Sequence, residues 1–258
     1  MRKTKIICTL GPALDDPAIL KRIFLTGMDV ARLNFSHGTH EEHLVRVNLF
    51  KQIRAELGRS AALLLDTKGP EIRLKKFRNG KIMLPTGSKF ILTTEDIEGD
   101  ETRVSVTYKE ITKDLAKGNR VLIDDGLIDL KVTSVTDTEV ICEVINGGEL
   151  SDKKGVNLQG VTARMPFMSD QDRRDLLFGI ENDFEFVAAS FVRNADDVKQ
   201  IKSFLEEHGG GFIKVISKIE NRDGVKNIDE IIRVSDGTMV ARGDMGVEIS
   251  FEEIPRLQ

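Results

Sequence analysis

The stretch Ser60–Arg73, SAALLLDTKGPEIR, contains the point at which the chain changes from one kind of structure to another. Its first half is an apolar run typical of a buried strand, and the run ends in Asp66, Thr67 and Lys68 before a Gly-Pro turn. Before this stretch, short apolar strands alternate with amphipathic helices, whereas after it the segments become short and β-rich. We therefore expect a second domain to be inserted at the end of this strand.

The segments on either side of the insert predict βαβ units and hence a parallel sheet. The predicted strands cover residues 4–10, 29–35, 60–67, 184–191, 212–220 and 237–244. The predicted helices cover residues 15–27, 40–58, 169–182, 194–209 and 224–235, with the first turn of another at 251–258. Helix-end signals support these bounds: Asp16 is a good N-cap before Pro17, Gly27 is a typical stop, and Ser169 with Asp172 has capping-box spacing.

Residues 70–166 predict an all-β domain, in which Asp125-Gly126 between apolar flanks indicates a hairpin. We divide the chain into a first barrel segment (1–69), this insert (70–166) and a second barrel segment (167–258). The insert takes more than a third of the 258 residues. At roughly 30 residues per βα unit, the rest supports about six units rather than eight. The fold class is therefore α/β, with an incomplete TIM-type (β/α)₈ barrel of about six strands and an inserted all-β domain.

Composition excludes several classes of function. The chain is 31% charged with a net charge of −4, which disfavours general attraction to nucleic acid or to an anionic membrane. No apolar run approaches the ~18 residues of a membrane span, and the first residues do not form a signal peptide. Cys8 and Cys142 are far apart in apolar contexts, so we expect reduced core cysteines and a cytoplasmic location.

Polar residues gather at the predicted carboxyl ends of the strands, where parallel α/β folds bind ligands. In the second strand Arg32, Asn34 and Ser36 share one parity, and Leu33 and Phe35 share the other. Strand alternation sends the two sets to opposite faces. We expect the apolar pair to face the helices and the polar set to line the barrel mouth.

Asn34 and Ser36 join Asp66 and Thr67, at the end of the neighbouring strand, in an oxygen-rich cluster that carries one full charge. Such a cluster fits a monovalent cation better than a divalent one.

A second group follows the fifth and sixth strands. Glu220 and Asp244 supply hard oxygen ligands at adjacent strand ends, which suits Mg²⁺. Lys218, two residues before Glu220, can stabilise charge that develops on a phosphoryl group or an enolate. The alternatives are ordinary: a carboxylate after a strand is often a helix cap or turn residue, and a lysine often extends to solvent.

Two other motifs are interpreted as structural. His37, His40 and His43 are three residues apart, which is not the spacing of a known zinc site, so we expect a loop and the start of a helix. The glycines at 209–211 precede a strand rather than follow one, so they indicate the end of a helix and not a phosphate loop.

With these residues in place, the chain resembles the pyruvate kinase family from Lys3 to Gln258. The resemblance rests on ordered stretches: TKIICTLGP, ARLNFSHGTHEEH, LLLDTKGPEIR, KKGVNLQGV, FVAASFVR, SKIENRDGVKNIDEI and MVARGDMGVE. It implies a barrel that carries the site, a β-rich lid inserted after the third strand and a separate C-terminal domain. It also implies a glycolytic phosphotransferase of the cytoplasm that converts phosphoenolpyruvate and ADP to pyruvate and ATP with Mg²⁺ (or Mn²⁺) and K⁺, usually as a homotetramer.

The resemblance also implies roles for individual positions. The catalytic residues are Arg32, on the substrate phosphate, and Lys218, which stabilises the transition state. The substrate contacts are Arg32, Lys218, the backbone of Gly243, and Asp244. The nucleotide contacts are Asn34, Arg73 and, from the lid, Lys154. The K⁺ ligands are Asn34, Ser36, Asp66 and Thr67, and the Mg²⁺ ligands are Glu220 and Asp244.

The chain departs from the family pattern at three places. Gln159 stands where the family usually has proline, and Arg164 and Met165 form an unusual return segment that we expect near the barrel mouth. The family's seventh strand, with a TATQML-like sequence, its eighth strand and its C-terminal domain would lie beyond Gln258. Two alternatives to an active pyruvate kinase therefore remain: an inactive portion that retains at most ligand binding, and a Mg²⁺-dependent lyase or aldolase of the phosphoenolpyruvate/pyruvate barrel type.

Overall fold

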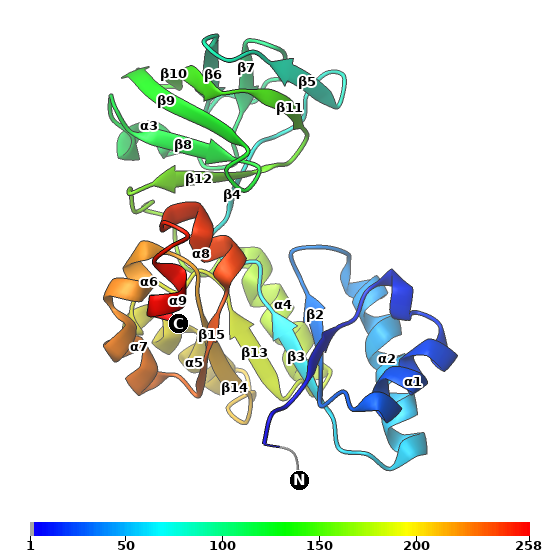
Figure 1. The fold of residues 1–258 in the computed structure, drawn as a ribbon. Helices are drawn as coiled ribbons and strands as arrows, with labels where there is room; N and C mark the ends of the chain where they lie inside the picture. Colours follow the sequence, from blue (N-terminus) through cyan, green and yellow to red (C-terminus); the bar gives the residue numbers. More distant parts are fainter. Residues whose placement is uncertain (1–2) are drawn as a thin grey trace. The chain divides into compact units, whose positions relative to one another are not determined.

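The computed structural model describes residues 3–258, which divide into two compact units. The first unit contains residues 3–69, 167–219 and 224–240, and the second contains residues 70–166, 220–223 and 241–258 (Figure 1). The short helix α6 (Arg222–Lys226) crosses the division. No helix in the described part of the chain has the length and apolar character that a membrane span requires.

The first unit is built on a six-stranded sheet in which every neighbouring pair is parallel. Its strands, in spatial order, are β1 (Ile7–Thr9), β2 (Val30–Asn34), β3 (Ala62–Asp66), β13 (Phe186–Ala189), β14 (Lys214–Ile219) and β15 (Gly237–Val240). Its helical segments are η1 (Pro12–Leu14), α1 (Pro17–Thr26), α2 (His40–Leu57), α4 (Asp170–Glu181), α5 (Ala195–Glu207) and α7 (Ile228–Val234). This confirms the incomplete barrel, because within residues 3–258 the edge strands β1 and β15 do not pair with each other.

The helix-end signals act as predicted. The Asp16 side chain accepts a hydrogen bond in the first turn of α1, and Gly27 ends that helix with a left-handed φ of 116°. In α4, Ser169 and Asp172 form the predicted capping box. Each of these groups satisfies backbone N–H or C=O groups that a helix end leaves without intrahelical partners.

Phe35 packs against the helices, as its parity predicts. Its ring stacks on His43 of α2 with centroids 4.2 Å apart and lies 5.6 Å from Phe178 of α4 and 6.4 Å from Phe184. The same alternation buries Leu33 completely and leaves Arg32 only half-buried.

The three histidines lie in a turn and at the start of α2, and two of them take part in the packing of that helix. His40 Nε2 lies 2.6 Å from Asp175 Oδ1 on α4, and His43 Nε2 lies 2.9 Å from the carbonyl oxygen of His37. Burial lowers the pKa of His43 and raises the pKa of Asp175. Burial therefore disfavours the charged form of each side chain relative to the same group in water.

Acidification is expected to destabilise the protein through His43. A lowered pKa in the folded state means that the unfolded chain binds the proton first, so stability present above pH 6.5 is lost as the pH falls through the folded-state pKa. One group changes the free energy of unfolding by at most about 1.4 kcal/mol per pH unit. Urea unfolding between pH 7 and pH 5 should show a shallower loss for His43→Leu than for the unmodified protein. His208→Leu, which removes an exposed histidine, is the control, and equal slopes in all three proteins would contradict the account.

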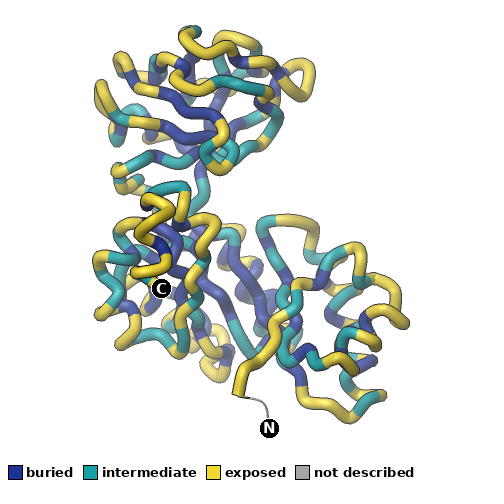
Figure 2. The backbone as a smooth tube through the Cα atoms, in the orientation of Figure 1, coloured by how far each residue is buried: buried dark blue, intermediate teal, exposed yellow. Residues whose placement is uncertain are grey.

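The edge strand β1 is more exposed than predicted. Ile6 and Ile7 are 43% and 45% exposed, and the chain here is drawn as exposed in Figure 2. Cys8 is accordingly only half-buried, so its assignment to the core was wrong, because an edge strand lacks a neighbour on one side. Cys142 is buried, and burial raises the pKa of its thiol to about 12.

The second unit is dominated by β-structure. Its seven-stranded sheet has the order β4 (Ile72–Arg73), β12 (Gly155–Gln159), β8 (Arg120–Ile123), β9 (Ile128–Val135), β10 (Glu139–Asn146), β6 (Lys89–Thr93) and β7 (Arg103–Ser105). A two-stranded sheet pairs β11 (Gly148–Ser151) with β5 (Lys81–Leu84). The all-β prediction missed the one-turn helix α3 (Ile111–Asp114), which is too short to produce a helical period in the sequence.

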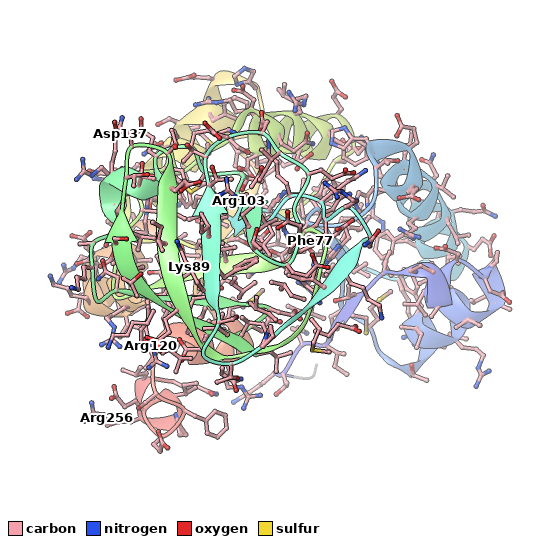
Figure 3. All side chains as sticks on the ribbon, turned by 90° about the horizontal axis from the view of Figure 1, so that it is seen from above. Phe77, Lys89, Arg103, Arg120, Asp137 and Arg256 are labelled. Atoms are coloured by element: carbon pink, nitrogen blue, oxygen red, sulfur yellow. The ribbon has the colours of Figure 1, made fainter. Side chains whose placement is uncertain are left out.

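The predicted hairpin at Asp125-Gly126 is confirmed, since β8 and β9 are antiparallel and Ile123 pairs with Ile128. Asp124, Asp125 and Gly126 all have left-handed φ values of 55°, 54° and 88°, which turn residues of these types tolerate. Across the same strand pair, Arg120 forms an ion pair with Asp129. Figure 3 labels Arg120 in this unit, together with Lys89 of β6 and Arg103 of β7.

Two predicted elements after residue 220 were wrong. The single helix predicted over 224–235 is divided into α6 and α7, with Asn227 between them. The strand predicted over 237–244 ends at Val240, and the helix α8 (Arg242–Glu248) begins almost at once. Asp244 lies in the first turn of α8, where the helix dipole favours an acidic side chain. The final helix, α9 (Ile254–Leu257), is the short turn expected around Pro255.

Candidate functional site

The candidate site of the first unit is centred on Asp66, at the carboxyl end of β3. The Asp66 side chain is 1% exposed, and two cations lie against it. Arg32 Nε donates to Asp66 Oδ2 at 2.6 Å, and Lys218 Nζ lies 3.1 Å from Asp66 Oδ1. A buried carboxylate needs such partners, because the cost of removing its charge from water is otherwise several kcal/mol.

The register of the sheet brings these groups together. Asn34 pairs with Asp66 on one side of β3, and Ala188 pairs with Asp66 on the other. On the far side of β13, Ala189 pairs with Ser217 of β14. The residues that follow these two, Ser190 and Lys218, therefore lie beside each other. The carboxyl ends of β2, β3, β13 and β14 therefore meet along one edge of the sheet.

Both cations are held in place from more than one side. Arg32 also donates through Nη1 to Thr9 Oγ1 at 2.8 Å, so the end of β1 helps to orient it. Lys218 is only 8% exposed and donates to the hydroxyl of Ser190 at 2.9 Å. The alternative in which Lys218 extends to solvent is therefore wrong.

The four residues predicted to bind K⁺ lie at the ends of β2 and β3. Asn34 Oδ1 accepts the backbone N–H of Ser36 at 3.0 Å, which fixes the turn after β2. Thr67 is buried, and its Oγ1 accepts the backbone N–H of Ser190 at 3.1 Å. Amide, hydroxyl and carbonyl oxygens beside one carboxylate are the donor set that suits a monovalent cation. Their role as ligands stays a prediction.

Ser190 and Thr9 contact the site and were not identified from the sequence. Each comes directly at or after the end of a strand, so an inspection of every strand end would have included them. Unlike Ser36 and Thr67, each stands alone between apolar neighbours, and a lone serine or threonine after a strand is common.

The predicted nucleotide contacts Arg73 and Lys154 lie in the second unit and have partners there. Arg73 Nε donates to Glu71 Oε2 at 2.8 Å, and its Nη1 donates to the carbonyl oxygen of Lys153 at 2.7 Å. Lys154 Nζ lies 2.8 Å from Asp124 Oδ1. The ion pairs of Arg73 and Lys154 are partly exposed, so each contributes little to stability.

The two carboxylates predicted to bind Mg²⁺ also fall in the second unit. Glu220 is 2% exposed and directly follows β14, whereas Asp244 is exposed in the first turn of α8, one residue after Gly243. Among residues 3–258 there is no group of three or more His, Cys, Asp or Glu residues arranged to hold a metal ion. The role of Glu220 and Asp244 as Mg²⁺ ligands stays a prediction.

The family is shown by comparison with known proteins. The family model described as "Pyruvate kinase, barrel domain" matches residues 1–258. The chain belongs to the pyruvate kinase family. A "Pyruvate kinase" of Clostridium perfringens is 49% identical over 259 residues, covering 100% of this chain and 55% of the relative. Those of Staphylococcus haemolyticus and Geobacillus stearothermophilus are 48% and 49% identical, again over 100% of this chain and 44% of each relative. The chain thus spans about half the length of the curated relatives it matches.

The return segment that departs from the pyruvate kinase pattern, around Arg164, makes its contacts with residues of the second unit. Arg164 Nε lies 3.1 Å from Asp114 Oδ1, and the Arg164 backbone N–H donates to Asp114 Oδ2 at 3.0 Å. Thr162 Oγ1 donates to Asp223 Oδ2 at 2.6 Å. Asp114 also accepts the hydroxyl of Tyr108, and burial together with this bond raises the pKa of Tyr108 to about 12. Gln159 is the last residue of β12.

Gly69→Ala is expected to destabilise the protein by about 1–3 kcal/mol, because Gly69 has a left-handed φ of 70° and no room for a side chain. A Cβ there would lie 2.9 Å from the carbonyl oxygen of Ser190. Gly58→Ala is the control, since Gly58 has a φ of 58° but nothing within 4 Å of the added atom. Urea unfolding should show the larger loss for Gly69→Ala. Equal losses would mean that the approach to Ser190 is unimportant.

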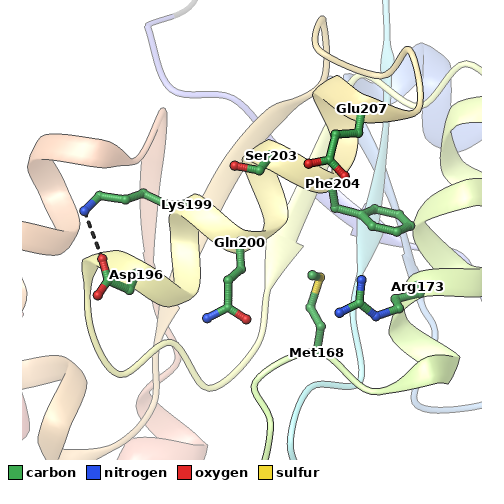
Figure 4. A pocket seen from close by; sticks show the side chains of 8 residues that line it. All are labelled: Met168, Arg173, Asp196, Lys199, Gln200, Ser203, Phe204 and Glu207. Atoms are coloured by element: carbon green, nitrogen blue, oxygen red, sulfur yellow. Dashed lines mark hydrogen bonds and ion pairs between the residues drawn. The ribbon is translucent and has the colours of Figure 1, made fainter.

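A pocket of about 400 Å³ lies on the outer helices of the first unit and contains none of the predicted site residues. It is formed by α5 together with Met168, which precedes α4, and Arg173 of α4 (Figure 4). The Arg173 guanidinium lies 5.5 Å from the centroid of the Phe204 ring, and Lys199 pairs with Asp196 at 2.9 Å. The pocket is therefore separate from the strand ends.

Proposed function

We propose that the protein carrying this chain transfers the phosphoryl group of phosphoenolpyruvate to ADP, giving pyruvate and ATP in glycolysis. The observation that carries the proposal is the pair of cations, Arg32 and Lys218, against the buried Asp66 carboxylate at the strand ends. Phosphoryl transfer depends mainly on positioned positive charge, because negative charge spreads over the phosphoryl oxygens in the transition state. Membership of the pyruvate kinase family supports this specific reaction.

Each catalytic side chain has a defined part in this proposal. Arg32 binds the substrate phosphate, and its contacts with Thr9 and Asp66 keep the guanidinium oriented before substrate arrives. Lys218 stabilises the charge that develops as the phosphoryl group leaves, and its burial strengthens that interaction. Further substrate contacts come from the Gly243 backbone and Asp244.

The donor atoms present fit the two kinds of cation that the family implies. Asn34, Ser36, Asp66 and Thr67 would hold K⁺, and Glu220 and Asp244 would hold Mg²⁺ or Mn²⁺. When bound, the divalent ion supplies positive charge to phosphate and carboxylate oxygens. The role of this chain's residues is to place oxygen donors at strand ends and, for Asp244, in the first turn of α8, and to exclude water from Asp66.

The remaining parts of the proposal concern the second unit, the cellular location of the protein and its oligomeric state. Residues 70–166 are proposed as a lid domain that binds nucleotide through Arg73 and Lys154, with Asn34 as a third contact. The protein is proposed to act in the cytoplasm and, as is usual in the family, as a homotetramer.

The reaction is tested by measuring pyruvate release from phosphoenolpyruvate by the protein as its gene encodes it. Pyruvate formation that requires ADP, Mg²⁺ and K⁺ together is the expected result. Cleavage of phosphoenolpyruvate without ADP would favour the lyase or aldolase alternative. Ligand binding without any turnover would favour the inactive alternative.

A further inference from the structure

Ser190 lies where the three central groups of the candidate site meet. Its hydroxyl is 2.9 Å from Lys218 Nζ, 3.1 Å from Asp66 Oδ1 and 2.6 Å from the carbonyl oxygen of Thr67. Its backbone N–H donates to Thr67 Oγ1 at 3.1 Å. Ser190 is 2% exposed, so these protein groups and not bulk water determine the direction of its hydroxyl.

A hydroxyl has one proton to donate and two lone pairs that accept. The Lys218 ammonium has only protons to give, so at this contact Ser190 accepts. Its own proton can then go either to the Thr67 carbonyl or to Asp66 Oδ1. The 2.6 Å contact is the shorter by half an ångström, and the proton therefore points to Thr67.

This direction has a consequence for Asp66. Its Oδ2 receives the Arg32 guanidinium through both Nε and Nη2, at 2.6 and 2.5 Å. Its Oδ1 receives the Lys218 ammonium at 3.1 Å. Each carboxylate oxygen has two acceptor positions. Because the Ser190 proton goes to Thr67, the second position on Oδ1 stays open for a cation.

The backbone on either side of the contact helps to hold the Ser190 side chain in this position. Phe191, the next residue, has a left-handed φ of 57°, a conformation that costs free energy for a non-glycine residue and is typical of functional sites. Gly69 comes so close that an added Cβ would be 3.1 Å from Ser190 Cβ. Two independent features of the chain therefore maintain the position of one serine side chain.

We propose that Ser190 is a positioning residue for phosphoryl transfer: its hydroxyl holds the Lys218 ammonium in place and directs its proton to Thr67, leaving Asp66 an open oxygen for the monovalent cation. The expected effect of Ser190 on turnover rests on the proposed function. The expected effect of Ser190 on cation binding can be measured without turnover.

The test compares Ser190→Ala with Ser217→Ala. Ser217 is also buried and lies on β14 beside Lys218, but its hydroxyl is directed to Ser235, at 2.7 Å, and not to the site. For Ser190→Ala we expect kcat to fall by about 10- to 100-fold with KM for phosphoenolpyruvate changed far less, and the K⁺ concentration for half-activation to rise. For Ser217→Ala we expect both kinetic constants within about twofold of the original, because its hydroxyl contacts Ser235 and its loss acts mainly on stability.

A second readout needs no turnover. The melting temperature is measured in KCl and in tetramethylammonium chloride at equal ionic strength. The original protein and Ser217→Ala should be stabilised by K⁺ relative to tetramethylammonium, and Ser190→Ala should lose that difference. A loss of the K⁺ difference supports the inference even if the proposed reaction fails. Ser190→Ala with an unchanged K⁺ difference, or with a kcat like that of Ser217→Ala, overturns it.

Discussion

Lys218→Met is expected to lower kcat for pyruvate formation by about 10³-fold while leaving the protein folded. The methionine keeps much of the volume and apolar stem of the lysine but removes the ammonium. That ammonium is nearly buried beside Asp66 and Ser190. When it is removed, bulk solvent therefore cannot compensate for the lost positive charge beside the transferring group. In a water-excluded site, a positioned charge is worth far more than it is at the surface.

The matched control is Lys214→Met, which removes an exposed lysine from the first position of the same strand. Its turnover should equal that of the original protein. Divalent-cation binding, followed with Mn²⁺ by electron paramagnetic resonance, should change little in either variant, since the proposed ligands are Glu220 and Asp244. Near-normal turnover of Lys218→Met would remove Lys218 from its proposed role.

Asp66→Asn is expected both to abolish most activity and to destabilise the fold by about 3–5 kcal/mol. The substitution keeps the shape of the side chain but removes the charge that Arg32 and Lys218 share. Arg32 is partly exposed and can recover water, whereas the Lys218 side chain is 10% exposed and would be left as a buried charge without its counter-ion. Breaking such a pair from one side costs more than the pair itself contributes.

Urea unfolding and steady-state kinetics of Asp66→Asn test this expectation together. The control is Asp183→Asn, which breaks an exposed ion pair with Lys51 by the same chemical change. The Asp183 side chain is 77% exposed, so its variant should lose at most about 1 kcal/mol. A loss for Asp66→Asn no larger than this would show that the central carboxylate is not essential to the fold.

Sequence patterns were sufficient to predict the parallel sheet and the faces of its strands. The alternation around Leu33 and Phe35 correctly identified the buried side of the strand, because a pleated strand has a strict period of two. Asp16, Ser169 and Gly27 marked helix ends correctly, because their side chains or φ values satisfy groups that every helix end exposes. The estimate of about six βα units also agrees with the observed sheet.

Other features depend on contacts that no local pattern records. The hydroxyl of Ser190 matters because β3, β13 and β14 place Asp66, Thr67 and Lys218 around it, and only the register shows this. The end of β15 was misplaced because no capping side chain marks the start of α8: its N-cap is Ala241, which makes no side-chain cap hydrogen bond. Cys8 looked like a core residue because its neighbours are apolar, but an edge strand exposes apolar side chains.

The most direct test of the account follows the phosphoryl group itself. Phosphorus-31 NMR is recorded on phosphoenolpyruvate and ADP with Mg²⁺, K⁺ and the protein as its gene encodes it. The account predicts that the phosphoenolpyruvate resonance disappears as an equal amount of ATP γ-phosphate appears, and that Lys218→Met shows neither change over the same period. Release of inorganic phosphate without ATP, or equal transfer by Lys218→Met, would contradict it.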